Sequence, residues 1–329
     1  MENRIQEIFG LNLDENQRKA SYDFIETFIE DSVTDWSTAP DTETIEIAFT
    51  AALQALSNNE LAFLLVHSGY IPEFYSHDSS QETLYSKLVE SLVCEWAQRI
   101  GFTDSVLQKQ KSNKEDVTIR VENNTIVCDT KSFRLGRSQA APNVKDTIKQ
   151  AAYISWLDQY KDNNCRAGLV TFPSLMDWKK GSEAYKYFSD YTLPILFLFY
   201  EHLSFILISD ELNHQTIIDL LNGYEDVFPN SSKSRADYID GLANTIFSSP
   251  IKEVLDDFLQ LTDLIIVEKV QHSITRIEEK AIKTKEFIAY KINEMEPDQV
   301  KEIAVEASYA NEYGQTLKQL KNIKKFRPH

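Results

Sequence analysis

Apolar residues recur at helical spacing through the first hundred residues of the chain. Residues 25–65 carry stripes that predict two or more amphipathic helices. The strongest helix signal runs from Gln81 to Ile100, with Ser79 or Ser80 as the N-cap and Gly101 as the stop. The apolar positions of this helix form one stripe: Leu84, Leu88, Leu92, Val93 and Trp96.

Beyond Gly101 the pattern changes to that of β-strands. Strands are predicted at Val117–Val121, Thr125–Asp129, Ala167–Phe172 and Ile195–Tyr200. A helix is predicted over Val144–Tyr160, between the second and third strands. Helices that alternate with strands in this way indicate an α/β fold with a central mixed sheet.

Helical spacing returns in the C-terminal part of the chain. An apolar stripe runs from Val254 to Val267, and a long charged run follows from Ile274 to Met295. Such helices pack either on the core of their own chain or on a second subunit, and both remain open. We therefore expect three parts: a helical region over residues 1–78, an α/β core over 79–215, and a helical region over 216–329 that is a candidate for dimerisation.

The composition describes a protein with a sizeable core and free thiols. The chain has 329 residues, 42% of them hydrophobic, which is enough to bury one large domain or two intimate ones. Three cysteines, Cys94, Cys128 and Cys165, lack the spacing of metal sites, and we expect them to be reduced. No signal-peptide pattern opens the chain, and Glu201 and His202 interrupt its most apolar run. We therefore expect a cytoplasmic protein with no membrane partner.

The charge is unevenly distributed along the chain. A net charge of -17 argues at first against a polyanionic partner, because phosphate contacts depend on Lys and Arg. Residues 107–150, however, contain nine basic and five acidic residues, a net +4, which leaves -21 for the rest. An acidic body with one basic segment fits a nucleic-acid enzyme with a confined cleft, and it also fits a solvated charged loop.

The basic segment contains a predicted hairpin. Its two strands flank Asn123-Asn124, and because asparagine tolerates positive φ this pair predicts a tight turn. A turn centred there places Asp116 opposite Lys131. Asp129 precedes Lys131 by two residues on the same strand and projects from the same face. Two carboxylates and one amine are thus predicted to converge at one end of the hairpin.

This set of groups suits the hydrolysis of phosphodiesters. The hard carboxylate oxygens of Asp116 and Asp129 are ligands for Mg²⁺, and the amine of Lys131 positions the attacking water and offsets charge at phosphorus. The alternative is an exposed hairpin with ordinary surface charges, since an Asp-x-Lys triplet is common by chance.

The residues around this hairpin resemble a known family. The string Asp129-Thr-Lys-Ser-Phe-Arg-Leu-Gly-Arg137, preceded by Asp116, resembles the active-site stretch of the HindIII family of type II restriction endonucleases, within the PD-(D/E)xK nuclease class. Further points of likeness are Ile71-Pro72-Glu73, Ser80-Gln-Glu-Thr-Leu-Tyr-Ser-Lys87 and Glu201-His202-Leu203. Together they cover about residues 60–210, and the two ends resemble the family only in being helical.

The resemblance implies a restriction-endonuclease-like core in which Asp116 and Asp129 bind Mg²⁺ and Lys131 acts on the nucleophile. It also implies that Glu90 is a supporting acid, although the position of Glu90 off the apolar stripe predicts a side chain that faces solvent. One departure from the class pattern is that Glu115, instead of proline, precedes Asp116. The proline is not a ligand, so the assignment stands, but Glu115 becomes a competing candidate ligand.

The residues after the Asp129–Lys131 triplet are the candidates for DNA contacts. They are Arg134, Arg137, Ser138, Gln139, Asn143 and Lys145. Arginine and asparagine can pair with guanine and adenine edges, so Arg137 and Asn143 are the best base-reading candidates, while phosphate contact is the plainer role for each. His202, beside an apolar strand, is expected to be a core histidine instead of a base. Trp96, Trp156 and Trp178 are expected to be core aromatics.

We therefore expect a homodimeric type II endonuclease that hydrolyses both strands of duplex DNA with Mg²⁺ at a short palindrome and leaves 5′-phosphate ends. The resemblance suggests the site AAGCTT and a cognate DNA methyltransferase in the same host. Two alternatives remain open. One is a structure-selective repair or recombination nuclease of the same class, and the other is a non-enzymatic, acidic helical interaction protein.

Overall fold

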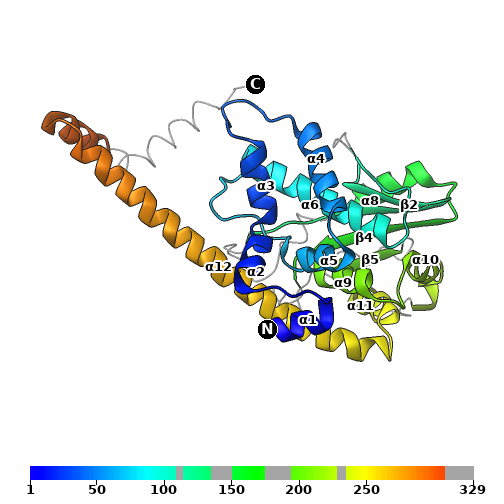
Figure 1. Cartoon of the computed structure of the whole chain (residues 1–329). Helices are drawn as coiled ribbons and strands as arrows, with labels where there is room; N and C mark the ends of the chain where they lie inside the picture. Colours follow the sequence, from blue (N-terminus) through cyan, green and yellow to red (C-terminus); the bar gives the residue numbers. More distant parts are fainter. Residues whose placement is uncertain (109–113, 135–149, 175–193, 228–234, 308–329) are drawn as a thin grey trace, which may run out of the picture. The chain divides into compact units, whose positions relative to one another are not determined.

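The computed structural model describes residues 1–108, 114–134, 150–174, 194–227 and 235–307 (Figure 1). The chain divides into two compact units, Met1–Ser273 and Ile274–His329. One hydrophobic core runs through the first unit, from Ile5 near its N-terminus to Ile266. Within that unit, residues from all three parts expected from the sequence therefore contribute to a single core.

Helices build the N-terminal part of the first unit. They are α1 (Glu2–Phe9), α2 (Glu15–Tyr22), α3 (Phe24–Ser32), α4 (Thr42–Gln54), α5 (Asn58–His67) and α6 (Ser80–Arg99). The predicted cap of α6 is confirmed, because the Ser79 hydroxyl accepts the Glu82 N–H at 3.2 Å. Just beyond α6, Gly101 takes a φ of +114°, which an L side chain rarely adopts.

The described strands form one five-stranded sheet in the order β1-β2-β3-β4-β5. The strands are β1 (Val106–Leu107), β2 (Val117–Val121), β3 (Asn124–Thr130), β4 (Cys165–Phe172) and β5 (Ile195–Phe199). The pairs β1/β2 and β2/β3 are antiparallel, and β3/β4 and β4/β5 are parallel. The predicted mixed sheet is confirmed; β1 escaped prediction because two residues are too short to show a period.

The register of the β2–β3 hairpin differs from the prediction. Val117 pairs with Cys128 and Val121 with Asn124, so the turn is Glu122-Asn123, with Glu122 at a φ of 50°. The prediction that Asp116 lies opposite Lys131 is therefore wrong by two positions. A shift of two residues leaves every side chain on its predicted face, because side chains alternate with a period of two. The convergence of the charged groups therefore does not depend on the error.

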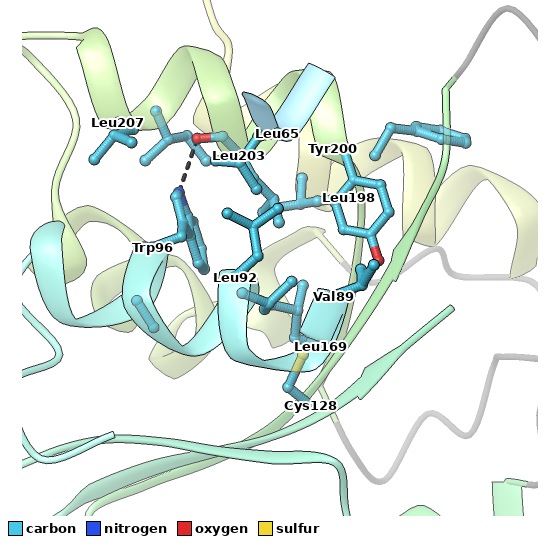
Figure 2. Close-up of a cluster of buried hydrophobic side chains, with 14 of the residues drawn as sticks. Leu65, Val89, Leu92, Trp96, Cys128, Leu169, Leu198, Tyr200, Leu203 and Leu207 are labelled. Atoms are coloured by element: carbon cyan, nitrogen blue, oxygen red, sulfur yellow. Dashed lines mark hydrogen bonds between the residues drawn. The ribbon is translucent and has the colours of Figure 1, made fainter. Parts of the chain in front are cut away.

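Helices cover both faces of the sheet near this hairpin. They are α8 (Gln150–Leu157), which leads into the 3₁₀ turn η1 (Asp158–Tyr160), and α9 (Tyr200–Ile208). Figure 2 shows Cys128, Leu169 and Leu198 facing α6 and α9, where the Trp96 indole donates to the Leu203 carbonyl at 2.8 Å. Neighbouring strand residues point to opposite faces, and Asp129, next to Cys128, contacts α8. The hairpin end therefore lies between two helical layers.

The remaining elements are α10 (His214–Asn222), the 3₁₀ turn η4 (Tyr224–Val227), α11 (Arg235–Ile246) and α12 (Ile251–Asn293). The apolar stripe at the start of α12, offered by the sequence as a dimer contact, is core on one side: Leu261 and Ile265 are both 0% exposed. Leu264, on the same helix, is 44% exposed. Internal packing thus accounts for the central positions of the stripe. No helix among the described residues is long and apolar enough to cross a membrane.

We predict that Leu261→Ala lowers the free energy of unfolding by about 2–5 kcal/mol, because it leaves a cavity in a packed core. Leu264→Ala is the matched control on the same helix, and its cost should stay below about 1 kcal/mol. Urea unfolding followed by circular dichroism measures both. Equal costs for the two variants would show that Leu261 is not in the core.

Candidate active site

Asp116, Asp129 and Lys131 meet at the end of the hairpin. Asp116 directly precedes β2, and its N–H donates to the Cys128 carbonyl of β3 at 3.0 Å. The amine of Lys131, just past β3, lies 2.5 Å from Oδ1 of Asp129. The Asp129 side chain is 8% exposed and that of Lys131 is 20% exposed, so the pair lies at the border of the interior. The structure therefore brings together the three groups that the sequence singled out.

Asp116 is held in a place that disfavours its charge. Burial raises the pKa of its carboxyl well above the ordinary value of 3.8, and the negative charges of Glu90 and Asp129 raise it further. The Thr130 N–H, which donates to Oδ2 at 2.9 Å, and the Lys131 amine only partly offset these effects. The site thus holds more negative charge than its one amine balances.

Glu90 belongs to this site and does not face solvent. It lies in the middle of α6 and is 5% exposed. The expectation of a solvent-facing side chain is wrong because α6 is covered on nearly all sides, with every residue from Leu88 to Ala97 buried. A single apolar stripe in the sequence understates such a helix. The negative charge of Glu90 raises the pKa of Asp116. This proximity is consistent with the supporting acid that the resemblance implies.

The chain just after Asp129 is fixed by hydrogen bonds to two other elements. The Lys131 N–H donates to the Thr171 carbonyl on β4 at 2.9 Å, and the Tyr200 hydroxyl donates to the Lys131 carbonyl at 2.9 Å. The Tyr200 ring passes close to Gly69, where an added Cβ would lie 2.6 Å from it. These contacts hold the backbone that carries the amine.

Tyr153 on α8 makes a further contact to the site that the sequence does not predict. Its hydroxyl donates to Oδ2 of Asp129 at 2.9 Å, and the residue is 0% exposed. Burial and the charge of Asp129 raise the pKa of Tyr153 well above its ordinary value, so the hydroxyl keeps its proton. The helix predicted over Val144–Tyr160 did not single out this tyrosine. No local pattern points to a carboxylate on a distant strand.

Arg134 is held inside the protein. Its guanidinium lies 3.1 Å from the Glu82 carboxylate and donates to the carbonyls of Pro72 at 3.1 Å and Ser76 at 3.4 Å. The side chain is 8% exposed. The expected DNA contact therefore does not fit this geometry, in which Arg134 ties the end of the catalytic stretch to residues 72–82. Two of the segments that resemble the family, Ile71–Glu73 and Ser80–Lys87, meet at this arginine.

Glu115 is engaged away from the site. Its Oε1 accepts hydrogen bonds from Thr118 Oγ1 at 2.7 Å and from the Tyr160 hydroxyl at 2.8 Å, and the residue is 1% exposed. These contacts assign it a structural role and weaken its candidacy as a competing ligand.

The other candidate DNA-binding residues lie outside the described residues: Arg137, Ser138, Gln139, Asn143 and Lys145. Trp178 lies outside them as well, whereas Trp96 is buried and Trp156 is half-buried. The three cysteines are free, as expected, and all three are buried.

His202 is a core histidine, as expected from the sequence. Its Nδ1 accepts the Phe199 N–H at 3.3 Å, and its ring packs 5.0 Å from the ring of Phe247. Burial lowers the pKa of His202 to about 4. The imidazole is therefore neutral near pH 7 and stabilises the start of α9 instead of carrying protons.

The donor set fits a divalent cation bound jointly with a phosphate. Within the described residues, no group of three or more His, Cys, Asp or Glu side chains is arranged to hold a metal ion alone. A magnesium site commonly needs only one or two carboxylates, because waters and substrate phosphate complete its shell. Asp116 and Asp129 could supply those two, and a divalent cation bound there would neutralise the surplus negative charge that contributes to the raised pKa of Asp116.

The mixed sheet with helices on both faces and this carboxylate–amine cluster define a nuclease with a restriction-endonuclease-like fold. The family model described as HindIII restriction endonuclease matches residues 27–307, which include Glu90, Asp116, Asp129 and Lys131. The chain is also 27% identical over 241 residues to the type II restriction enzyme HindIII of Haemophilus influenzae, covering 72% of this chain and 75% of that protein. The chain belongs to the HindIII restriction endonuclease family.

Family membership decides between the alternatives that the sequence left open. The chain is a type II site-specific endonuclease, with DNA as its substrate and a divalent metal ion as its cofactor. A non-enzymatic interaction protein and a structure-selective repair nuclease are both set aside.

The low pKa of His202 predicts a loss of stability in acid. Between pH 6.5 and pH 4 the unfolded chain binds a proton at this residue that the folded protein excludes, so the free energy of unfolding falls as the pH falls. Over that window, 2.5 pH units at 1.36 kcal/mol each amount to about 3 kcal/mol. His202→Gln keeps an acceptor for the Phe199 N–H and should remove this contribution.

Urea unfolding of wild type and variant at several pH values measures the difference. The comparison is needed because buried His67 also has a lowered pKa. Parallel pH profiles for the two proteins would show that His202 does not titrate in this way.

Proposed function

We propose that this protein uses Mg²⁺ to cut both strands of duplex DNA at a short palindromic site and leaves 5′-phosphate ends. The cluster of Asp116, Asp129, Glu90 and Lys131 at the hairpin end is the observation that carries the proposal. AAGCTT is the first site to test, on the strength of the family resemblance.

Each member of the cluster has a distinct role in the proposal. Asp116 and Asp129 hold the metal, which supplies Lewis-acid stabilisation of the phosphate and lowers the pKa of bound water. The Lys131 amine orients the attacking water and offsets the charge that develops on phosphorus. Glu90 supports Asp116 from α6.

DNA contacts are assigned to the segment that follows the cluster. Arg137, Ser138, Gln139, Asn143 and Lys145 are the proposed contacts, with Arg137 and Asn143 reading bases. Arg134 is given a structural role instead, because its guanidinium already pairs with Glu82. A cognate methyltransferase that protects the same sequence belongs to the proposal, and so does a cytoplasmic location.

We predict that Asp116→Asn, Asp129→Asn and Lys131→Ala each lower the rate of DNA cutting by about a thousandfold or more. The two asparagine variants lose a negatively charged metal ligand, and the alanine variant loses the amine that acts on water. Digestion of a sequenced plasmid with Mg²⁺, followed by end-mapping, measures the rate, the site and the chemistry of the ends.

Glu115→Gln is the matched control, since Glu115 is adjacent to Asp116 in sequence. The amide oxygen of the substituted glutamine can still accept hydrogen bonds from Thr118 and Tyr160. This variant should cut within about threefold of wild type. Wild-type cutting by any of the three cluster variants at saturating Mg²⁺ refutes the role given to that residue. Scattered cut positions, or 3′-phosphate ends, refute the proposed specificity or products.

Concerted cutting of both strands needs two copies of the cluster, because one set serves one strand. The second half of α12 offers a surface for a second copy of this chain. Four of its exposed apolar side chains recur three, four and seven residues apart, the spacing of a coiled-coil seam. They are Ile274, Ile277, Ala281 and Ile288. This set replaces Leu261 and Ile265, which the core already uses.

We predict that Ile277→Glu combined with Ile288→Glu converts a dimer of twice 37.9 kDa into a monomer. Light scattering coupled to size-exclusion chromatography gives the mass, and the variant should nick plasmid without linearising it. Phe287→Glu is the control, because Phe287 is 60% exposed but lies off the seam. A double variant that remains dimeric places the subunit contact elsewhere.

A further inference from the structure

We propose that Tyr153 is a positioning residue of the catalytic centre: it fixes the orientation of the Asp129 carboxylate and thereby sets the affinity for the metal ion. The inference rests on the proposed function and deepens it. It adds a residue from α8 to a site otherwise built from α6 and the β2–β3 hairpin.

Asp129 is held from two directions. Its Oδ1 faces the Lys131 amine at 2.5 Å, and its Oδ2 accepts the Tyr153 hydroxyl at 2.9 Å. Two donors on different oxygens stop the carboxylate from rotating about its terminal bond. Each ionised oxygen has a second lone pair, so these hydrogen bonds leave acceptor positions for a cation. Partners of this kind fix a ligand before the metal arrives, and their loss commonly costs 10–100-fold in metal affinity or activity.

Tyr153 is itself held rigidly. It is 0% exposed, and its ring lies 5.0 Å from the ring of Trp156 on the same helix. On the sheet side it rests against Gly168 of β4, where an added Cβ would lie 3.0 Å from Cδ1 of the tyrosine and 3.4 Å from Ile195. A methyl group at residue 168 would therefore crowd the ring, which would have to give by a few tenths of an ångström. Gly168→Ala thus tests the position of the tyrosine hydroxyl without changing either partner of the hydrogen bond.

A second tyrosine provides a matched comparison. Tyr160, seven residues along the chain, donates its hydroxyl at 2.8 Å to Oε1 of Glu115, the residue next to Asp116. Both tyrosines thus lie in the α8–η1 segment, and each donates its hydroxyl to a carboxylate of the hairpin region. Only the Tyr153 partner is a proposed metal ligand. Loss of the Tyr160 hydroxyl therefore reports the structural effect of removing such a hydrogen bond.

The experiment compares Tyr153→Phe, Gly168→Ala and Tyr160→Phe in the full-length protein. Each is titrated with MnCl₂ in the absence of DNA, with free Mn²⁺ measured by electron paramagnetic resonance. The Mg²⁺ concentration for half-maximal plasmid cutting and the melting temperature are recorded in parallel. We expect Tyr153→Phe to weaken Mn²⁺ binding by about 10–100-fold and to raise the Mg²⁺ requirement to match. Gly168→Ala should also weaken Mn²⁺ binding and raise the Mg²⁺ requirement. Tyr160→Phe should leave the Mn²⁺ affinity and the Mg²⁺ requirement within about threefold of wild type.

Three outcomes overturn the inference. If Tyr153→Phe binds Mn²⁺ and depends on Mg²⁺ as the wild type does, the inference that Tyr153 positions Asp129 is wrong. Equal losses in Tyr153→Phe and Tyr160→Phe that follow their melting temperatures reduce the role of Tyr153 to ordinary stability. A wild-type protein that neither binds Mn²⁺ nor cuts DNA overturns the proposed function and the inference with it, whereas the first two outcomes beside an active wild type leave the proposed function intact.

Discussion

Asp116 and Asp129 are held close together at the end of the β2–β3 hairpin, where burial removes the water that would screen their charges. Burial raises the pKa of Asp116 well above 3.8, and the negative charges of Glu90 and Asp129 raise it further. The folded protein holds this proton more tightly than the unfolded chain does. As the pH rises above 3.8, the ionisation of Asp116 therefore lowers the free energy of unfolding. A divalent cation bound at such a site would offset the repulsion among the buried carboxylates, and this would favour its binding.

The rest of the fold maintains this arrangement against the repulsion. Large apolar side chains on α6 and α9 pack one face of the sheet (Figure 2). On the other face, α8 contacts the sheet through Tyr153 and Asp129. The Tyr200 hydroxyl donates to the Lys131 carbonyl, and the Thr171 carbonyl accepts from the Lys131 N–H. Together with the Arg134–Glu82 ion pair, these contacts fix the chain beyond Asp129. Folding free energy from burial across the first unit thus keeps a few charged groups in positions that they would not take by themselves.

The sequence predicted the features that follow from local period and failed on those set by distant packing. Strand alternation predicted one face for Asp129 and Lys131, and the two-residue error in the hairpin register did not move Asp116 off that face, since it preserves parity. The burial of Glu90 was missed because α6 is enclosed on nearly all sides, which one apolar stripe cannot reveal. Tyr153 was missed because its partner is 24 residues away along the chain. The apolar face of α12 was visible, but its division between core and exposed positions follows from the tertiary fold.

The central claim is that Asp116 and Asp129 together hold one metal ion. Anomalous diffraction from crystals of the protein soaked in Mn²⁺ tests this most directly, because it locates the ion without relying on activity. The account predicts a single strong anomalous peak within about 2.5 Å of a carboxylate oxygen from each residue. A peak at Glu115 or elsewhere, with none between Asp116 and Asp129, would contradict it.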